Sequence, residues 1–109
     1  YDAPESYNQK GVQKYFNGKA MRWLDQLSTI FSAEKDFVVT KIEKLIRKYA
    51  EDEQVSAGTL IHPLRLALTG DIASPGIFEI VEILGKDKVI NRINKAVRYI
   101  ETNIKVSTN

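Results

Sequence analysis

The chain has 109 residues, of which 43% are hydrophobic and 28% are charged, and its formal net charge is +2. This composition is typical of a globular protein, and the length suits one small domain or the distal part of a larger one. The absence of cysteine excludes disulfides and thiolate zinc sites. No apolar run approaches the roughly 20 residues that span a bilayer, and no leader pattern indicates secretion. Because the chain opens with Tyr1 and its only methionine is Met21, we expect a piece of a longer protein.

The first half of the sequence predicts three helices. We expect residues 1–8 to be a lead-in or linker, followed by a short helix over 9–16 that ends near Asn17-Gly18. A second helix is predicted from an apolar stripe at helical spacing, made of Ala20, Trp23, Leu24, Leu27, Ile30 and Phe31. Ser32 is the expected N-cap of a longer third helix. The apolar positions of this third helix are Val38, Ile42, Leu45, Ile46 and Tyr49. A loop over 51–60 is expected to follow.

The second half predicts three more helical segments. His62-Pro63 is expected to open a short helix that Gly70 closes, since proline suits a first turn and glycine a left-handed cap. Ser74-Pro75 should begin the next helix, which stops at Gly85. The last helix carries an apolar face of Val89, Ile93, Ala96, Val97, Ile100 and Ile104. The sequence therefore predicts an all-α fold of about five to six helices over residues 9–105, with a tail at 106–109.

Basic residues gather near the end of the chain. Residues 86–109 contain six basic residues and two acidic ones. Lys88, Arg92 and Lys95 are expected to share one flank of the last helix, where they could contact a phosphate backbone. The alternative is an ordinary solvated helix face.

Residues 62–80 hold the best candidates for a binding site. His62, Arg65 and Thr69 fall on one helix face, and the guanidinium of Arg65 can stack on a base and hydrogen-bond its edge. The N–H groups after Ser74 can receive a phosphate or a base acceptor. Phe78 lies off the apolar stripe, where it can face an unstacked base. The alternative is that Arg65 pairs with Asp71 or Glu79 and that Phe78 fills the core.

The sequence offers little for catalysis. One histidine and no cysteine exclude most metal clusters and the usual pairs of nucleophile and base. No glycine-rich loop has the spacing of a phosphate cradle. Glu79 and Glu82 are read as solvated carboxylates. We therefore expect no active site, metal or cofactor within these residues.

Four motifs in the second half resemble the C-terminal end of bacterial glutamyl-tRNA synthetases. The family has a Pro-Leu-Arg-x-Ala-x-Thr-Gly stretch, a Ser/Thr-Pro pair, a Gly-Lys helix end and an Arg-Ile/Leu-x-x-Ala element. In this chain the corresponding segments are Pro63 to Gly70, Ser74-Pro75, Gly85-Lys86 and Arg92 to Ala96. The order and spacing of the motifs agree together, and the resemblance extends less distinctively to Lys19-Ala20 and a helix from Glu34.

The resemblance implies a helical-cage anticodon-binding domain of a class I aminoacyl-tRNA synthetase. The family residues that lie against the anticodon loop correspond here to Arg65, Ser74, Pro75, Ile77 and Phe78. The parent enzyme would attach glutamate to tRNA with ATP and Mg²⁺ in an N-terminal catalytic domain, whose signature motifs are absent from this sequence. The implied partners are the tRNA anticodon loop and that catalytic domain, in a monomeric cytoplasmic enzyme with no membrane contact.

Two other interpretations remain open. The C-terminal helical cage of class I lysyl-tRNA synthetases is similar, although Ser74 to Phe78 and Gly85-Lys86 favour the glutamyl enzyme. A helical module that docks a partner protein through the apolar stripe near Trp23 is an alternative from another class.

Overall fold

The computed structural model describes residues 4–73 and 76–104, and the all-α prediction is confirmed. This described part contains six helices and no strand. The helices are α1 (Gln9–Tyr15), α2 (Gly18–Ala33), α3 (Val39–Asp52), α4 (Ala57–Thr69), α5 (Ile77–Leu84) and α6 (Lys86–Asn103). No helix of these described residues is both long enough and apolar enough to cross a membrane.

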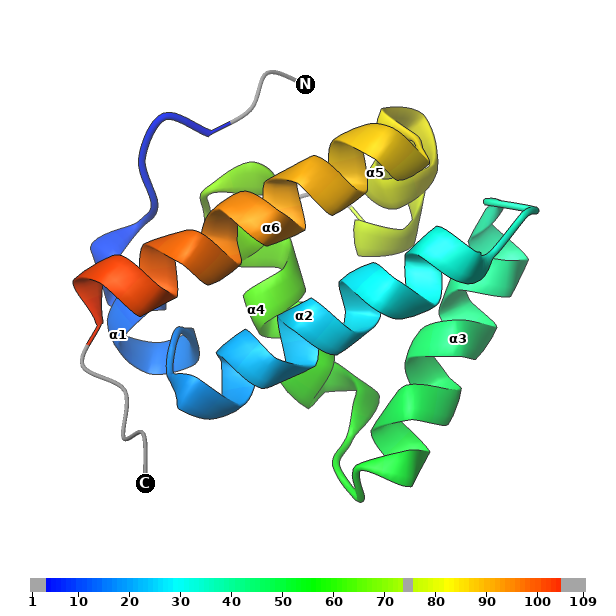
Figure 1. Ribbon diagram of the computed structural model, residues 1–109, viewed down its shortest axis with the longest axis horizontal. Helices are drawn as coiled ribbons and strands as arrows, with labels where there is room; N and C mark the ends of the chain where they lie inside the picture. The colour runs from blue at the N-terminus through cyan, green and yellow to red at the C-terminus, as the bar shows by residue number, and fades with distance from the viewer. Residues whose placement is uncertain (1–3, 74–75, 105–109) are drawn as a thin grey trace.

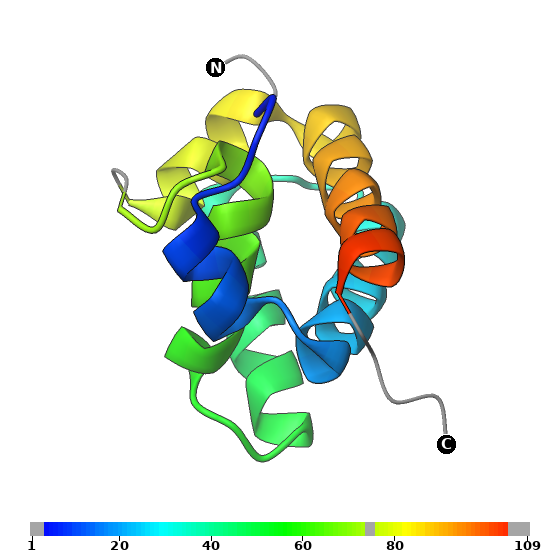
Figure 2. The same cartoon turned by 90° about the vertical axis from the view of Figure 1, so that its left-hand side faces the viewer.

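The two longest helices, α2 and α6, pack side by side, and α4 lies behind them (Figure 1). Viewed from the side, α1 and α4 lie opposite α2 and α6 (Figure 2). α3 packs against α4 and α5, at the end of the molecule opposite to α1 (Figure 1). The arrangement leaves one face of α4 and one face of α6 open to solvent.

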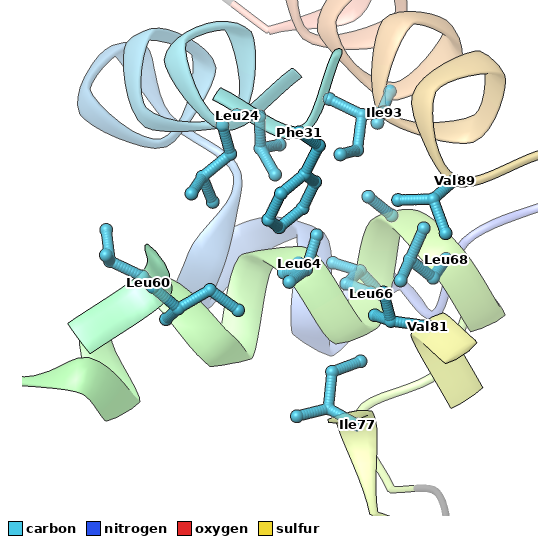
Figure 3. Packing of buried hydrophobic residues seen from close by; sticks show 14 of the residues in the cluster. Leu24, Phe31, Leu60, Leu64, Leu66, Leu68, Ile77, Val81, Val89 and Ile93 are labelled. Atoms are coloured by element: carbon cyan, nitrogen blue, oxygen red, sulfur yellow. The ribbon is translucent and has the colours of Figure 1, made fainter. Parts of the chain in front are cut away.

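One core occupies the space between these helices. Phe31 of α2 points between Leu64 of α4 and Ile93 of α6, and all three side chains are buried (Figure 3). The apolar stripes predicted for α2 and α6 supply much of this core, because residues spaced by three and four positions lie on one helix face. The stripe near Trp23 is therefore largely interior. Trp23 itself is half-buried, and its Nε1 donates to Glu53 Oε1 at 3.3 Å.

Asparagine side chains fix the starts of the first two helices. Asn8 Oδ1 accepts from the Gly11 N–H at 3.1 Å, and Asn17 Oδ1 accepts from the Ala20 N–H at 2.9 Å. Each cap satisfies a backbone donor that has no partner inside its helix. The expected break near Asn17-Gly18 is therefore the point where the Asn17 side chain caps the start of α2.

The N-terminal segment from Pro4 to Asn8 packs against the helices, whereas the sequence suggested a lead-in or linker. The Tyr7 ring belongs to the core, and the Asn8 N–H donates to the Gly70 carbonyl at 2.8 Å. Gly70 has φ +78°, and a Cβ placed on it would lie 2.7 Å from both Pro4 Cβ and Ser6 O. Only glycine therefore permits both this turn and the close approach of the segment.

The prediction that Ser32 is the N-cap of α3 is wrong. Ser32 lies inside α2, and its hydroxyl donates to the Ser28 carbonyl. α3 begins at Val39, five residues beyond Glu34, and its own N-cap residue, Val38, has no side-chain acceptor. Glu82 of α5 takes that role, because its Oε2 accepts from the Val39 N–H at 2.8 Å.

The expected start of α4 is also wrong. The helix begins at Ala57 rather than at His62-Pro63, and Ser56 is its N-cap, with Oγ accepting from the Thr59 N–H. Pro63 lies inside the helix, where its missing N–H leaves one carbonyl without its usual donor. The Pro63 ring is buried, and this burial offsets part of the cost. The predicted end at Gly70 is confirmed.

α5 starts later than the sequence indicated. Gly76 is the N-cap and Ile77 the first helical residue, whereas Ser74-Pro75 was expected to open the helix. Ser74 and Pro75 themselves lie outside the described residues. The expected stop at Gly85 is confirmed, and Gly85 separates α5 from α6.

Candidate nucleic-acid interface

The outer face of α4 carries the polar side chains that the sequence placed together. His62 is exposed, and Arg65 and Thr69 are half-buried. Residues at i, i+3 and i+7 share one helix face, so these three side chains form a strip along α4. Leu64, Ala67 and Leu68 occupy the opposite, buried face, as predicted. The strip is held rigidly because the other side of its helix is anchored in the core.

The turn after α4 is fixed by hydrogen bonds. Thr69 Oγ1 donates to the Arg65 carbonyl at 2.8 Å and accepts from the Asp71 N–H at 3.1 Å. Asp71 Oδ1 accepts from the Ile72 N–H at 2.7 Å. A Cβ placed on Gly11 would lie 2.6 Å from Ile72 Cγ2, so α1 leaves room for the loop at a position without a side chain. The loop therefore leaves α4 in a defined direction.

The first residues of α5 differ in exposure, because Phe78 lies partly at the surface and Ile77 turns inward. Phe78 is half-buried and packs against the core, which leaves part of its ring at the surface. The side chain of Ile77 is only 3% exposed and lies inside the core (Figure 3). Ile77 therefore supports the start of α5 from within, and little of its side chain is exposed at the surface. Ser74 and Pro75, two further expected contacts, lie outside the described residues.

The start of α5 suits a base better than a phosphate. Its N-cap, Gly76, makes no side-chain cap hydrogen bond, and the first N–H groups of a helix lack intrahelical acceptors. A Cβ placed on Gly76 would lie 2.9 Å from Glu79 Oε2, so a carboxylate folds back over this terminus. Because this carboxylate would repel a phosphate, a neutral base acceptor is the better partner.

Arg92 does not lie on the exposed flank of α6, where the sequence placed it. Its side chain is 6% exposed, and its NH1 donates to the Leu68 carbonyl at 3.0 Å. That carbonyl belongs to the last turn of α4, where a cation is favourable because the helix dipole is negative there. Arg92 therefore holds the C-terminal end of α4 from inside, and the prediction that it shares an exposed flank with Lys88 and Lys95 is wrong.

The other two expected phosphate contacts are at the surface. Lys88 and Lys95 are both exposed on α6. Lys95 Nζ donates to the Pro4 carbonyl at 3.3 Å, which ties α6 to the N-terminal segment. Arg98, one turn beyond Lys95, is also exposed. Arg98 is not among the expected phosphate contacts, although its spacing of three residues from Lys95 indicates a shared helix face.

A ring pair adjoins the strip on α4. Tyr15 of α1 stacks on His62 with ring centroids 4.9 Å apart and an interplanar angle of 14°. The two rings line an open pocket of about 450 Å³, together with Lys14, Trp23 and Pro63 among others. No sequence signal indicated Tyr15, because the pairing depends on how α1 packs against α4. The described residues contain no cluster of three or more His, Asp or Glu side chains that could hold a metal ion.

Comparisons with known proteins all point to the same protein family. The family model described as "Anticodon binding domain" matches residues 1–97. The glutamate--tRNA ligase 1 of Syntrophomonas wolfei subsp. wolfei is 39% identical over 101 residues, which are 92% of this chain and 20% of that protein. The corresponding protein of Caldanaerobacter subterraneus subsp. tengcongensis is 41% identical over 104 residues, which are 93% of this chain and 21% of that protein.

A solved structure shows the same fold. A glutamate tRNA ligase from Elizabethkingia meningosepticum, crystallised in complex with its amino acid, superposes with a TM-score of 0.87 at 31% identity. The match covers 91% of this chain and 20% of that one. The chain thus spans about a fifth of the length of the curated relatives it matches.

Proposed function

The chain belongs to the anticodon-binding domain family found in glutamate--tRNA ligases, and we propose that it binds the anticodon loop of a glutamate tRNA. The observation that carries this proposal is the match of the family model to residues 1–97. The polar strip on α4 supports it with side chains suited to unstacked bases.

We propose that the rest of the enzyme carries out the reaction. A glutamate--tRNA ligase attaches glutamate to tRNA, and we assign ATP and Mg²⁺ to a catalytic domain outside this chain. The domain described here contributes recognition, and its partners are the tRNA and that catalytic domain. We place the whole enzyme in the cytoplasm as a monomer.

Arg65 is the central residue of the proposed base-reading mechanism. Its half-buried side chain projects from a helix anchored in the core, so little conformational freedom is lost on binding. A guanidinium can stack on one base and hydrogen-bond the edge of another, which suits the splayed bases of a loop. Ser74 and Pro75 complete this surface in the proposal.

Aromatic rings supply the second part of the mechanism. The stacked pair of Tyr15 and His62 adjoins Arg65, because His62 lies three residues before it on α4, and Phe78 offers part of its ring on α5. A base stacked on an aromatic side chain contributes about 1–3 kcal/mol whatever its identity. We therefore assign affinity chiefly to the rings and discrimination chiefly to Arg65 and the start of α5.

The test is a titration with the anticodon stem-loop of glutamate tRNA against a stem-loop with a scrambled loop. Arg65→Ala should weaken binding of the native loop by about 1–3 kcal/mol, between roughly fivefold and a hundredfold in Kd, and should reduce the preference for it. The helical circular dichroism signal should stay unchanged. Arg47→Ala is the matched control, because Arg47 lies exposed on α3 and pairs with Glu43. If Arg65→Ala retained both the affinity and the preference, the assignment would be wrong.

A further inference from the structure

An exposed polar stripe runs along α6 on the side away from its apolar face. Its members are Lys88, Asn91, Lys95, Arg98 and Thr102. Alternating steps of three and four residues keep these side chains on one helix face. The two carboxylates of α6, Asp87 and Glu101, border the stripe at its two ends, four residues before Asn91 and three residues after Arg98. From Lys88 to Arg98 the stripe extends about 15 Å, because each helical residue adds about 1.5 Å.

The C-terminal half of the stripe borders an open pocket of about 380 Å³. The N-terminal segment forms its other wall, with Ser6, Tyr7 and Gln9 among the lining residues. The pocket wall from α6 includes Lys95, Arg98 and the ring of Tyr99. A single carboxylate among the residues lining this pocket, Glu5, opposes the two cations.

Arg98 differs from the other arginines in the described part of the chain. Arg22 pairs with Glu53, Arg47 pairs with Glu43, Arg92 donates to a buried carbonyl, and Arg65 is also engaged in an interaction. No ion pair or hydrogen bond within the described residues engages the guanidinium of Arg98. A guanidinium that is exposed at a pocket wall and flanked by Lys95 suits a phosphate, which it can bind through two parallel N–H···O bonds.

The N-terminal segment connects this pocket to the base-reading strip. On one side the Asn8 N–H donates to the carbonyl of Gly70, at the end of α4. On the other side Lys95 Nζ donates to the Pro4 carbonyl at 3.3 Å. α1 accordingly lies between the loop after α4 and the C-terminal half of α6 (Figure 2). An RNA strand that leaves the strip on α4 can cross α1 and reach α6.

We propose that Lys88, Lys95 and Arg98 form a phosphate-binding stripe that holds the RNA backbone flanking the anticodon loop, with Arg98 at the pocket as its main contact. The proposal rests on the proposed function, because it assumes that the RNA is bound at the strip on α4. The stripe contributes affinity that does not depend on base identity, whereas Arg65 contributes discrimination.

The experiment compares Arg98→Gln with Arg47→Gln in titrations of the native and scrambled stem-loops at several salt concentrations. Arg98→Gln should weaken binding of both loops by the same factor, about threefold to tenfold at low salt. It should also lower the slope of log K against log salt by about 0.7–1, the value for one lost phosphate contact. Arg47→Gln should change neither quantity. Glu5→Gln should have the opposite effect and tighten both loops.

The outcomes separate the two proposals. If Arg98→Gln behaves like Arg47→Gln while Arg65→Ala loses its preference for the native loop, the stripe is refuted and the base-reading function stands. If the unaltered chain binds both loops equally and Arg98→Gln weakens both, base reading fails and the stripe stands. A loss confined to the native loop would also overturn the stripe, because the stripe is proposed to add the same affinity to both loops. Helical circular dichroism identifies any variant that fails to fold, and Arg98→Lys, which keeps the charge, should keep the salt slope.

Discussion

Arg92 and Arg98 lie on the same helix, six residues apart, yet their surroundings assign them opposite roles. Arg92 lies beside the apolar face of α6 and reaches the Leu68 carbonyl at the end of α4. Arg98 lies on the far side and is exposed. A sequence gives both residues the same charge and helix propensity. Only the position of α4 distinguishes the buried arginine from the exposed one.

The pH dependence of stability can test the burial of a single side chain, Tyr7. Burial raises the pKa of the Tyr7 hydroxyl, and the neighbouring Tyr99 adds to the shift. Above about pH 10 the unfolded chain releases this proton while the folded chain keeps it, so stability falls as pH rises through the raised pKa. Tyr7→Phe should therefore lose less stability than the unaltered chain between pH 7 and about pH 11. Urea unfolding at both pH values measures the difference.

At neutral pH the same substitution should change the free energy of unfolding by no more than about 1 kcal/mol, because the ring packing is kept. The ring contacts Phe16 and Tyr99 edge-on, with centroids 5.3 Å and 4.8 Å away. Identical alkaline profiles for Tyr7→Phe and the unaltered chain would show that this hydroxyl does not contribute to the pH dependence.

At the scale of elements, the start of α3 depends on another helix. Glu82 of α5 accepts from the Val39 N–H, and its negative charge lies near the positive end of the α3 dipole. Glu82→Ala should lower the free energy of unfolding by about 1 kcal/mol, the usual cost of a lost N-cap. Glu82→Gln should restore part of the loss, because its amide oxygen can still accept. Thermal or urea unfolding measures the effect.

Glu101→Ala provides the control, since Glu101 is an exposed carboxylate of α6 that caps no helix. If Glu82→Ala and Glu101→Ala had equal effects, the contact between α5 and α3 would contribute nothing beyond an ordinary surface charge. The sequence alone predicts a solvated carboxylate at Glu82, because nothing local to α5 indicates that α3 begins beside it.

At the scale of the whole molecule, one core joins helices from both halves of the chain. Leu64 of α4 is completely buried, and it lies beside Phe31 of α2 (Figure 3). Leu64→Ala should lower the free energy of unfolding by about 2–5 kcal/mol, the cost of the lost burial and the remaining cavity. Unfolding should stay a single transition when it is followed by helical signal and by Trp23 fluorescence, because no helix has a separate core. Two separate transitions would contradict a single cooperative unit.

The sequence by itself determined the features that depend on residues close together in the chain. The stripes of α2 and α6 were predicted because helical spacing is a local property, and the end of α4 followed from the backbone freedom of Gly70. The outward face of α4 with Arg65 was predicted for the same reason. The resemblance in the second half of the chain then indicated the family.

Only the tertiary structure decided the features that depend on neighbours distant in sequence. Ile77 turns into the core, Arg92 reaches the end of α4, and Glu82 caps α3. Burial and hydrogen-bond partners are properties of the space between elements, and the periodicity of one helix does not specify which element fills that space. The candidate tRNA surface is therefore smaller on the apolar side of α5 than the sequence implied, and on α6 it extends to Arg98 in place of Arg92.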